Sequence, residues 1–331
     1  MTTPTIVDLA SHLRLDKSTV SRALNGKPGV ASRTRRRVMQ AAREHGYIPN
    51  IHGRRLRGHQ SKTVALVLHQ FADVFTARWH GPLTMEILSE VAARGYDLSV
   101  VDISHHQGQD LAHVLFQKGA AGAVLMGGNF PAEALDSVQG SALPIIQLDA
   151  HSEEHPDVAY VASENFEAIY RMTWHLIDLG HRRLACAGPP ELLSCFGERY
   201  RGFQKALAEA GLEEIGSTVM RDEHHEAQLL SLTPRPTAVV CLCDTYAEGT
   251  LIAAREAGFS VPDDLSVTGF DDVDQAFVRA VSLTTVRADL GAMARTAIDY
   301  LVNGGQTPKQ AEFRVGAELI LRGSTAPPAT N

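Results

Sequence analysis

The sequence predicts an all-α head with a helix-turn-helix, followed by a larger α/β body built from parallel, doubly wound sheets in two lobes. One observation is a series of short amphipathic helical patterns within residues 1–49. Another is the regular alternation of strand-like and helix-like runs from Thr63 onward. The third is charge, because residues 1–61 hold 12 Lys/Arg and 3 Asp/Glu, whereas residues 62–331 hold 19 and 35. A head of net +9 on a body of net −16 indicates a polyanionic partner for the head.

The first two helices are predicted within residues 5–24. Thr5 and Asp8 have the spacing of a capping box at the start of the first helix, and Asp16 can cap the second. The apolar stripe of the first helix consists of Ile6, Leu9, Ala10 and Leu13. The inner face of the second helix consists of Val20, Ala23 and Leu24. Its outer face carries Lys17, Ser18 and Arg22. Two tightly joined helices are typical of a DNA-binding helix-turn-helix when the second carries basic and hydroxyl side chains on its outer face. An ordinary helical hairpin with solvated charges has the same pattern.

A third helix is predicted from a cap at Ser32 to Gly46. The run Thr-Val-Ser-Arg-Ala-Leu-Asn at 19–25, then Val30, Thr34-Arg35, Val38 and Gly-Tyr-Ile-Pro-Asn at 46–50, resembles the lactose/galactose repressor family of bacterial transcription regulators. The resemblance continues to about residue 322. It implies a sequence-specific regulator, most simply a repressor, that binds a near-palindromic operator as a homodimer.

With this resemblance, the outer face of the second helix is expected to contact base edges in the major groove through Lys17, Ser18 and Arg22, with Arg22 suited to guanine. Phosphate contacts set register without carrying sequence information. They are expected from Thr5, Thr19, Ser21, Asn25, Thr34, Tyr47 and Asn50.

Residues 50–61 are basic and too polar to form a core of their own. A plain flexible linker is one interpretation. The resemblance implies instead a hinge helix in the minor groove, with Arg54 and Arg55 beside Leu56 as an apolar wedge. Gly53 departs from a good helix sequence, so this hinge is expected to depend on the operator for its order.

The body alternates strands and helices, which predicts parallel sheets covered on both faces. Strands are predicted at 63–68, 98–103, 121–126 and 144–148, and a second series begins near Val158 with strands at 184–187, 238–242 and 265–268. The resemblance implies a periplasmic-binding-protein-like architecture in which the chain returns to the first lobe near residue 290. We therefore expect a first lobe of 62–160 and 290–323, a second of 161–289, and a frayed tail at 324–331.

Ligands of doubly wound sheets bind beyond the carboxyl ends of the strands. The residues at those ends are Gln70, Phe71, Asp73, Phe75, Asp149, Asp244, Tyr246 and Asp271, and Arg199 precedes a predicted helix. Arg199-x-x-Gly-Phe and Gly-Phe-Asp271-Asp resemble family elements that contact effector. Alternatively, Asp149 and Asp271 cap turns, and Phe71 and Phe75 belong to the lobe core.

Carboxylates and an arginine fork suit an oxygen-rich ligand. A neutral or weakly acidic carbohydrate is therefore the favoured effector, and a purine or a phosphorylated sugar acting as corepressor is the alternative.

Enzymes, cofactor-dependent proteins and membrane proteins fit the sequence poorly. It contains no GxSxG, GxxxxGK[ST] or GxGxxG motif, and no apolar run of membrane-spanning length. The four cysteines lack metal-site spacing and are expected to be buried free thiols. No cofactor, metal site or catalytic residue is predicted, and a cytoplasmic, nucleoid-associated location is expected.

Overall fold

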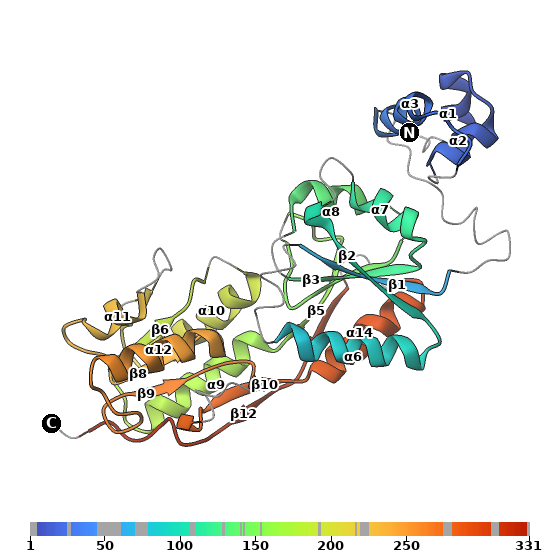
Figure 1. The fold of residues 1–331 in the computed structure, drawn as a ribbon. Coiled ribbons are helices and arrows are strands. Elements are labelled where there is room, and N and C mark those ends of the chain that lie inside the picture. Colours follow the sequence, from blue (N-terminus) through green and yellow to red (C-terminus); the bar gives the residue numbers. More distant parts are fainter. Residues whose placement is uncertain are drawn as a thin grey trace.

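The computed structural model describes residues 5–24, 28–44, 61–69, 79–105, 110–127, 130–139, 141, 143–152, 154–190, 193–215, 217–218, 225–273, 280–305 and 311–329. Figure 1 shows a small helical head followed by a body of two α/β lobes. The predicted fold class is therefore confirmed.

The described head contains α1 (Ile6–Leu13), α2 (Lys17–Leu24) and α3 (Ser32–Glu44). The capping box is present, with the Asp8 amide donating to Thr5 Oγ1 at 3.3 Å and the Thr5 amide donating to Asp8 Oδ2 at 2.8 Å. Asp16 Oδ1 accepts the Ser18 amide at 2.7 Å, which confirms the cap of α2. The predicted cap at Ser32 is wrong by one residue, because α3 already includes Ser32 and its first carbonyl acceptor is Ala31. The three helices share one core, to which Leu9, Val20, Leu24 and Val38 contribute.

The first lobe has a six-stranded parallel sheet in the order β11-β5-β4-β3-β1-β2. Its strands are β1 (Thr63–Leu68), β2 (Asp97–Asp102), β3 (Gly122–Met126), β4 (Ile145–Leu148), β5 (Ala159–Ser163) and β11 (Glu312–Val315). Its helices are α6 (His80–Ala93), η1 (Ile103–His105), α7 (Leu111–Lys118), α8 (Ala132–Val138) and α14 (Leu290–Val302).

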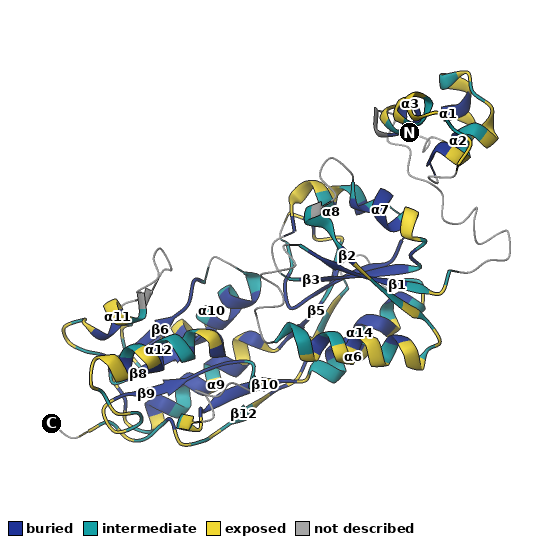
Figure 2. Cartoon of the chain, in the orientation of Figure 1, coloured by how far each residue is buried: buried dark blue, intermediate teal, exposed yellow. Residues whose placement is uncertain are grey.

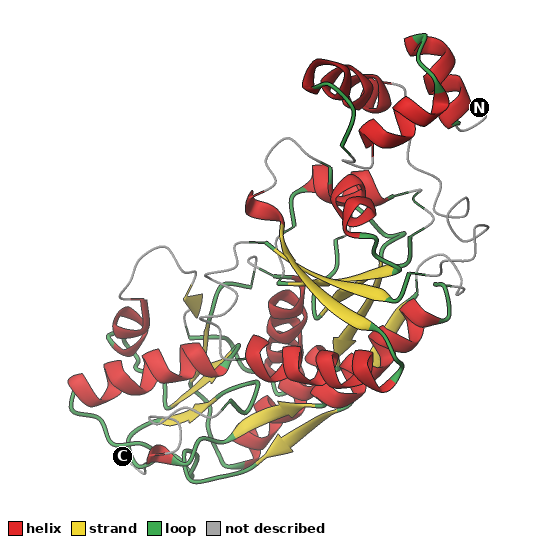
Figure 3. Ribbon diagram, turned by 45° about the vertical axis from the view of Figure 1, so that its right-hand side comes forward, coloured by secondary structure: helices red, strands yellow, loops and turns green. Residues whose placement is uncertain are grey.

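Successive side chains of β1 pack on opposite faces of the sheet. Leu66 packs in the core with α6 and α14, and Val67 packs in the core with α7 and α8. Figure 1 shows α6 and α14 side by side, and Figure 3 shows helices on both faces of the sheet in this lobe.

The second lobe has a four-stranded parallel sheet in the order β7-β6-β8-β9. Its strands are β6 (Leu184–Ala187), β7 (Ser217–Thr218), β8 (Ala238–Cys241) and β9 (Ser266–Thr268). Its helices are α9 (Asn165–Asp178), α10 (Ser194–Glu209), α11 (His225–Leu230) and α12 (Asp244–Glu256). An antiparallel pair, β10 (Thr285–Ala288) and β12 (Ala317–Ile320), joins the core under α9 and α10. Figure 2 shows both sheets buried beneath partly exposed helices.

The predicted lobe boundaries need two corrections. The second series of strands does not begin near Val158, because β5 pairs with β4 and β11 in the first sheet. Residues 317–323 do not belong to the first lobe, because β12 pairs with β10 and packs in the core of the second. Both errors arise because strand pairing across a hinge is not visible in local sequence patterns. Within the described segments, no helix has the length and apolarity to cross a bilayer.

The prediction of a frayed tail is wrong for residues 324–326. Ser324 is fully buried, and its hydroxyl donates to the Val267 carbonyl at 2.6 Å while accepting the Thr284 amide at 2.8 Å. Ala326 exchanges hydrogen bonds with Ser266 Oγ in both directions at 3.1 Å. The tail therefore completes the edge of the second lobe, which its small polar composition did not indicate.

Candidate functional site

The outward face of α2 carries the three side chains that were predicted to contact bases. Lys17, Ser18 and Arg22 are exposed, whereas Val20 and Leu24 of the same helix are buried in the head core. Ser18 and Arg22 are four residues apart and so lie on one side of the helix. The core thus fixes the orientation of α2 while its basic and hydroxyl groups remain available to a partner.

The predicted phosphate contacts are described only in part. Thr5 is exposed at the start of α1, and Thr19, Ser21 and Thr34 are half-buried. The other predicted DNA contacts and the hinge wedge lie outside the described residues: Asn25, Tyr47, Asn50, Arg54, Arg55 and Leu56.

Arg199 is the centre of a buried polar cluster in the body, with 2% of its surface exposed. Its Nη2 donates to Asp149 Oδ2 at 3.1 Å, its Nε to Asn165 Oδ1 at 2.8 Å, and its Nη1 to the Leu242 carbonyl at 2.7 Å. The guanidinium carbon lies 3.5 Å from the centroid of the Phe270 ring. Each nitrogen of the fork is therefore held in a defined direction.

The sequence predicted a loop at Arg199, but α10 already begins at Ser194. Buried Cys195, Arg199 and Phe203 recur at helical spacing on α10, so tertiary packing outweighs the low helix propensity of this segment.

Asp149 follows β4 in the first lobe with φ 48°, a left-handed backbone conformation. Its Oδ1 accepts the Ser163 amide of β5 and the Asn165 side-chain amide, both at 3.1 Å. Burial raises the pKa of Asp149, while Arg199 and these two donors act against the rise. The carboxylate joins the ends of neighbouring strands to Arg199 and does more than cap its own turn.

Asp271 follows β9 in the second lobe and has φ 115°, which is unfavourable for a residue with a side chain. Its amide donates to the Val286 carbonyl at 2.8 Å, and its Oδ1 lies 3.7 Å from Arg199 Nη1. Burial raises the pKa of Asp271 well above its usual range, and Arg199 opposes this. Burial acts to lower the pKa of Arg199, but Asp271 and other neighbouring groups raise it above its ordinary value. One guanidinium thus lies between a carboxylate of each lobe.

Asp244 was predicted to bind effector, but both of its oxygens are used within the second lobe. Oδ1 accepts the Thr285 hydroxyl at 2.7 Å, and Oδ2 accepts the Val273 amide at 2.9 Å. Burial raises the pKa of Asp244 to about 7. A Cβ at Gly269 would clash with Asp244 Oδ1, so glycine is needed for this close approach. Asp244 therefore positions the loop that carries Asp271.

Tyr246, also predicted to bind effector, packs edge-on against the ring of Phe196 at 6.0 Å between centroids. The remaining predicted effector residues lie outside the described residues: Gln70, Phe71, Asp73 and Phe75.

Sequence reasoning missed the ion pair between Glu198 of α10 and Arg314 of β11. Arg314 Nη1 and Nη2 donate to the two oxygens of Glu198 at 2.7 Å each, in a bidentate arrangement that links the lobes. Glu198 Oε2 also accepts Asn165 Nδ2 at 3.3 Å. Glu198 adjoins Arg199 in the sequence, but Arg314 lies 116 residues further along the chain, so no local pattern could pair them.

A cavity of about 830 Å³ lies beside this cluster, with walls from both lobes. Trp79, Glu86 and Leu290 line it from the first lobe, and Asp271, Ala288 and Ala317 from the second. Trp79 packs against the first-lobe core and also lines the cavity. Its indole N–H is buried, and no described residue supplies an acceptor for it.

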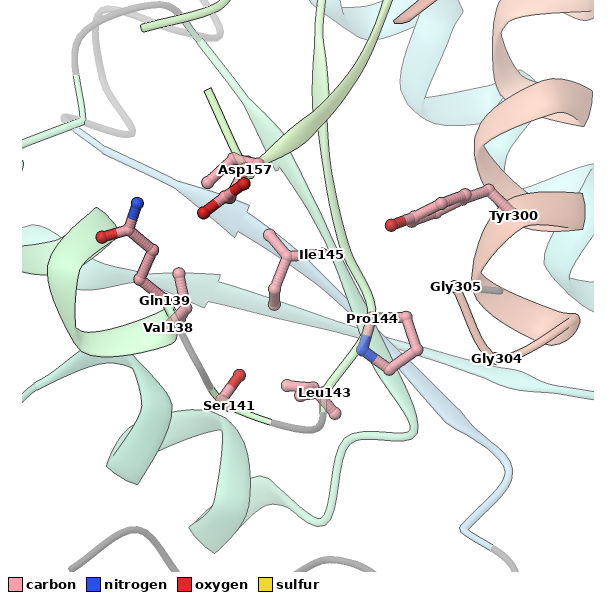
Figure 4. A pocket seen from close by; sticks show the side chains of 11 residues that line it. Val138, Gln139, Ser141, Leu143, Pro144, Ile145, Asp157, Tyr300, Gly304 and Gly305 are labelled. Atoms are coloured by element: carbon pink, nitrogen blue, oxygen red, sulfur yellow. The ribbon is translucent and has the colours of Figure 1, made fainter. Parts of the chain in front are cut away.

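A second cavity, of about 230 Å³, lies where β4 and β5 begin. Figure 4 shows Gln139, Asp157 and Tyr300 around it. Because this is the amino-terminal edge of the sheet, the larger cavity near the carboxyl ends is the better candidate for ligand binding.

Comparison with known proteins gives the family. Residues 5–50 match the model for bacterial regulatory proteins of the lacI family, and residues 173–325 match a periplasmic binding protein-like domain. The chain is 31% identical to the HTH-type transcriptional repressor CytR of Escherichia coli strain K12 over 342 residues, covering 98% of this chain and 97% of that relative.

Two solved structures share the fold. A complex of the transcriptional regulator CelR with cellobiose has a TM-score of 0.71 at 24% identity and covers 97% of this chain and 99% of its own. The Lac repressor dimer bound to operator and the anti-inducer ONPF has a TM-score of 0.69 at 23% identity, covering 98% and 100%. The chain therefore belongs to the lacI family of bacterial regulatory proteins, and it is a DNA-binding transcriptional regulator with a helix-turn-helix head and a periplasmic-binding-protein-like body.

Proposed function

We propose that this regulator is a cytoplasmic repressor that binds a near-palindromic operator as a homodimer and responds to a carbohydrate held between its lobes. The repressor role is supported by the similarity to CytR. The sugar and the dimer are supported by the solved complexes of CelR with cellobiose and of the Lac repressor dimer with operator. The proposal contains no catalytic step.

The observation that carries the effector site is the position of Arg199 between the two lobes. It donates to Asp149 of the first lobe at 3.1 Å and lies 3.7 Å from Asp271 of the second. A ligand with several hydroxyls in the adjacent cavity can donate to Asp271, which lines the cavity and lies beside Arg199. Binding there favours one arrangement of the lobes over another, because the contacting groups belong to both.

The DNA site is assigned to the exposed face of α2. Lys17 and Arg22 are suited to the acceptors of guanine, and Ser18 can donate or accept. Since effector and operator bind the same molecule, each changes the affinity of the other by the same factor.

The test is a titration of purified protein with duplexes from beside its own gene, followed by fluorescence anisotropy at low salt. Sugars, nucleosides and purines, first screened by thermal shift, are then added. We expect specific binding to one duplex and a change in affinity with one class of sugar. Binding that is equal on all duplexes, with every compound present or absent, would refute the proposed function.

A further inference from the structure

The cavity between the lobes has an excess of acidic side chains. Its described walls include Glu86, Asp271, Asp272, Asp289 and Glu318, but only two basic residues, Arg171 and Arg287.

Both of these arginines already have carboxylate partners. Arg287 lies 2.7 Å from Asp272 and 3.7 Å from Glu318, and Arg171 lies 3.7 Å from Glu167 and donates to the Ala317 carbonyl at 3.0 Å. Among the described wall residues, no basic side chain therefore remains without a carboxylate partner to bind an anionic ligand.

Asp271 is the carboxylate that most needs a further partner. Arg199 makes its hydrogen bond to Asp149 at 3.1 Å and reaches Asp271 only at 3.7 Å. No hydrogen bond to the Asp271 carboxylate is found within the described part of the chain, and its side chain is only 14% exposed. A desolvated carboxylate gains from hydroxyl or ammonium donors, whereas a ligand phosphate beside it adds a repulsive charge.

Trp79 supplies an apolar group to the same cavity from the first lobe. Its indole N–H is buried and not exposed to the cavity, so what it offers a ligand is packing rather than a hydrogen bond. An aromatic ring packs well on the apolar face of a sugar or beside a cation.

We propose that the effector is an uncharged or cationic ring compound that donates to Asp271 and packs against Trp79, and that this cavity rejects phosphate esters and other anions. This inference rests on the proposed function only in taking the cavity for the effector site. It excludes the phosphorylated sugars that the sequence had left open.

The first test measures the sign of the electrostatic potential in the cavity and needs no effector. Gly291 lies in the cavity wall, and a Cβ there would be 3.6 Å from both Glu86 Oε2 and Asp289 Oδ1, an ordinary contact. The Gly291→Cys protein is reacted with the trimethylammonioethyl and the sulfonatoethyl methanethiosulfonates. In both reactions the thiolate attacks the reagent sulfur, forms a mixed disulfide and releases methanesulfinate, so only the charge of the reagent differs. The four native cysteines are buried.

We compare the reaction rate of the cationic reagent with that of the anionic reagent. We expect this rate ratio to be roughly tenfold or more higher for Gly291→Cys than for a small free thiol. The advantage should shrink at about 0.5 M salt and after the further substitution Glu86→Gln. Ser231→Cys, at an exposed position after α11, serves as the surface control. A ratio equal to that of the free thiol, or lower, overturns the proposal.

The second test uses matched compounds in the operator titration, each sugar or nucleoside beside its own phosphate ester. The free compound should change operator affinity at lower concentration than its ester. An ester that acts at lower concentration overturns the inference but leaves the proposed function intact. If no compound acts, the proposed function is contradicted, and the reagent ratio still decides the charge of the cavity.

Discussion

The head and the body of this regulator use charged residues in opposite ways. In the head, Lys17 and Arg22 are exposed and lie opposite a small apolar core. In the body, Arg199 is 2% exposed and Asp149 is 7% exposed, and both are bonded to backbone and side chains of two lobes. The side chains proposed to read DNA are therefore separable from the fold, whereas the groups proposed for the effector site are part of it.

This difference has a physical origin in the ligands. DNA is a polyanion that attracts exposed cations over a distance. The side chains that contact it therefore need only be held on a rigid helix. The small neutral molecule proposed as effector offers few contacts, and these are strong only where water is excluded. Substitutions should thus cost folding free energy in the body and binding free energy in the head.

The largest loss of stability is expected for Arg199→Ala. Removing the guanidinium leaves Asp149 and Asp271 buried without their cation, which costs about 3–5 kcal/mol in comparable buried pairs. Urea unfolding measures this loss. Where the variant is folded, the effector response of operator binding should be absent.

Two variants separate charge from geometry at this position. Arg199→Lys keeps the positive charge but cannot donate to Asn165, Leu242 and Asp149 together, so it should recover part of the stability and little of the effector response. Arg201→Ala, at an exposed position of the same helix, should stay within about 0.5 kcal/mol of the parent. An Arg199→Ala protein as stable as Arg201→Ala would remove the claimed dependence of the fold on this cluster.

A pH-dependent loss is expected from Asp244, whose pKa is about 7 in the folded protein against an ordinary 3.8. The folded state keeps this proton to higher pH than the unfolded chain does. Its contribution to stability is therefore complete below about pH 4 and is lost as the pH rises through 7. Asp244→Asn does not titrate, so its stability relative to the parent should rise by on the order of 2–3 kcal/mol between about pH 5 and pH 8.

Urea unfolding at several pH values checks this, with Asp263→Asn as an exposed aspartate control. Parallel stability profiles for the parent and Asp244→Asn would show that burial of this carboxylate does not control the titration.

A smaller loss is expected for Ser324→Ala in the tail. The change leaves the Thr284 amide and the Val267 carbonyl without the hydroxyl that joins them, at a cost of about 1–3 kcal/mol. Ser89→Ala, on the exposed side of α6, is the control and should have almost no effect. Equal unfolding midpoints for the two variants would restore the sequence-based expectation of a loose tail.

Local patterns predicted the elements well, because they depend on neighbouring residues. The strands at Thr63–Leu68 and Leu184–Ala187 have the predicted bounds, and the caps at Thr5 and Asp16 form as expected. Packing between distant segments was not predictable in this way. The burial of Ser324 depends on β9 and on the segment before β10, and the position of β12 depends on β10.

The site shows the same division. Asp149 and Asp271 were found because residues after strands of doubly wound sheets converge at one edge, and Arg199 was found through a family motif. Arg314 was not found, since its partner Glu198 is distant in the chain, and no sequence feature marked Trp79 as a residue that lines the cavity. Sequence periodicity cannot distinguish a side chain that packs on a core from one that also lines a cavity.

The smallest effect on stability, and the sharpest test of the separation between head and body, is expected for Arg22→Ala. The side chain is exposed and contributes nothing to the head core, so unfolding should change by less than about 0.5 kcal/mol. Operator affinity should nevertheless fall by about 1–3 kcal/mol, while non-specific binding falls little, because a base contact carries sequence discrimination. Arg36→Ala removes an equal charge from an exposed position of α3 and should weaken both kinds of binding alike. If Arg22→Ala also lowered the two affinities equally, Arg22 would be a phosphate contact, and the reading face of α2 would have to be reassigned to Lys17 and Ser18.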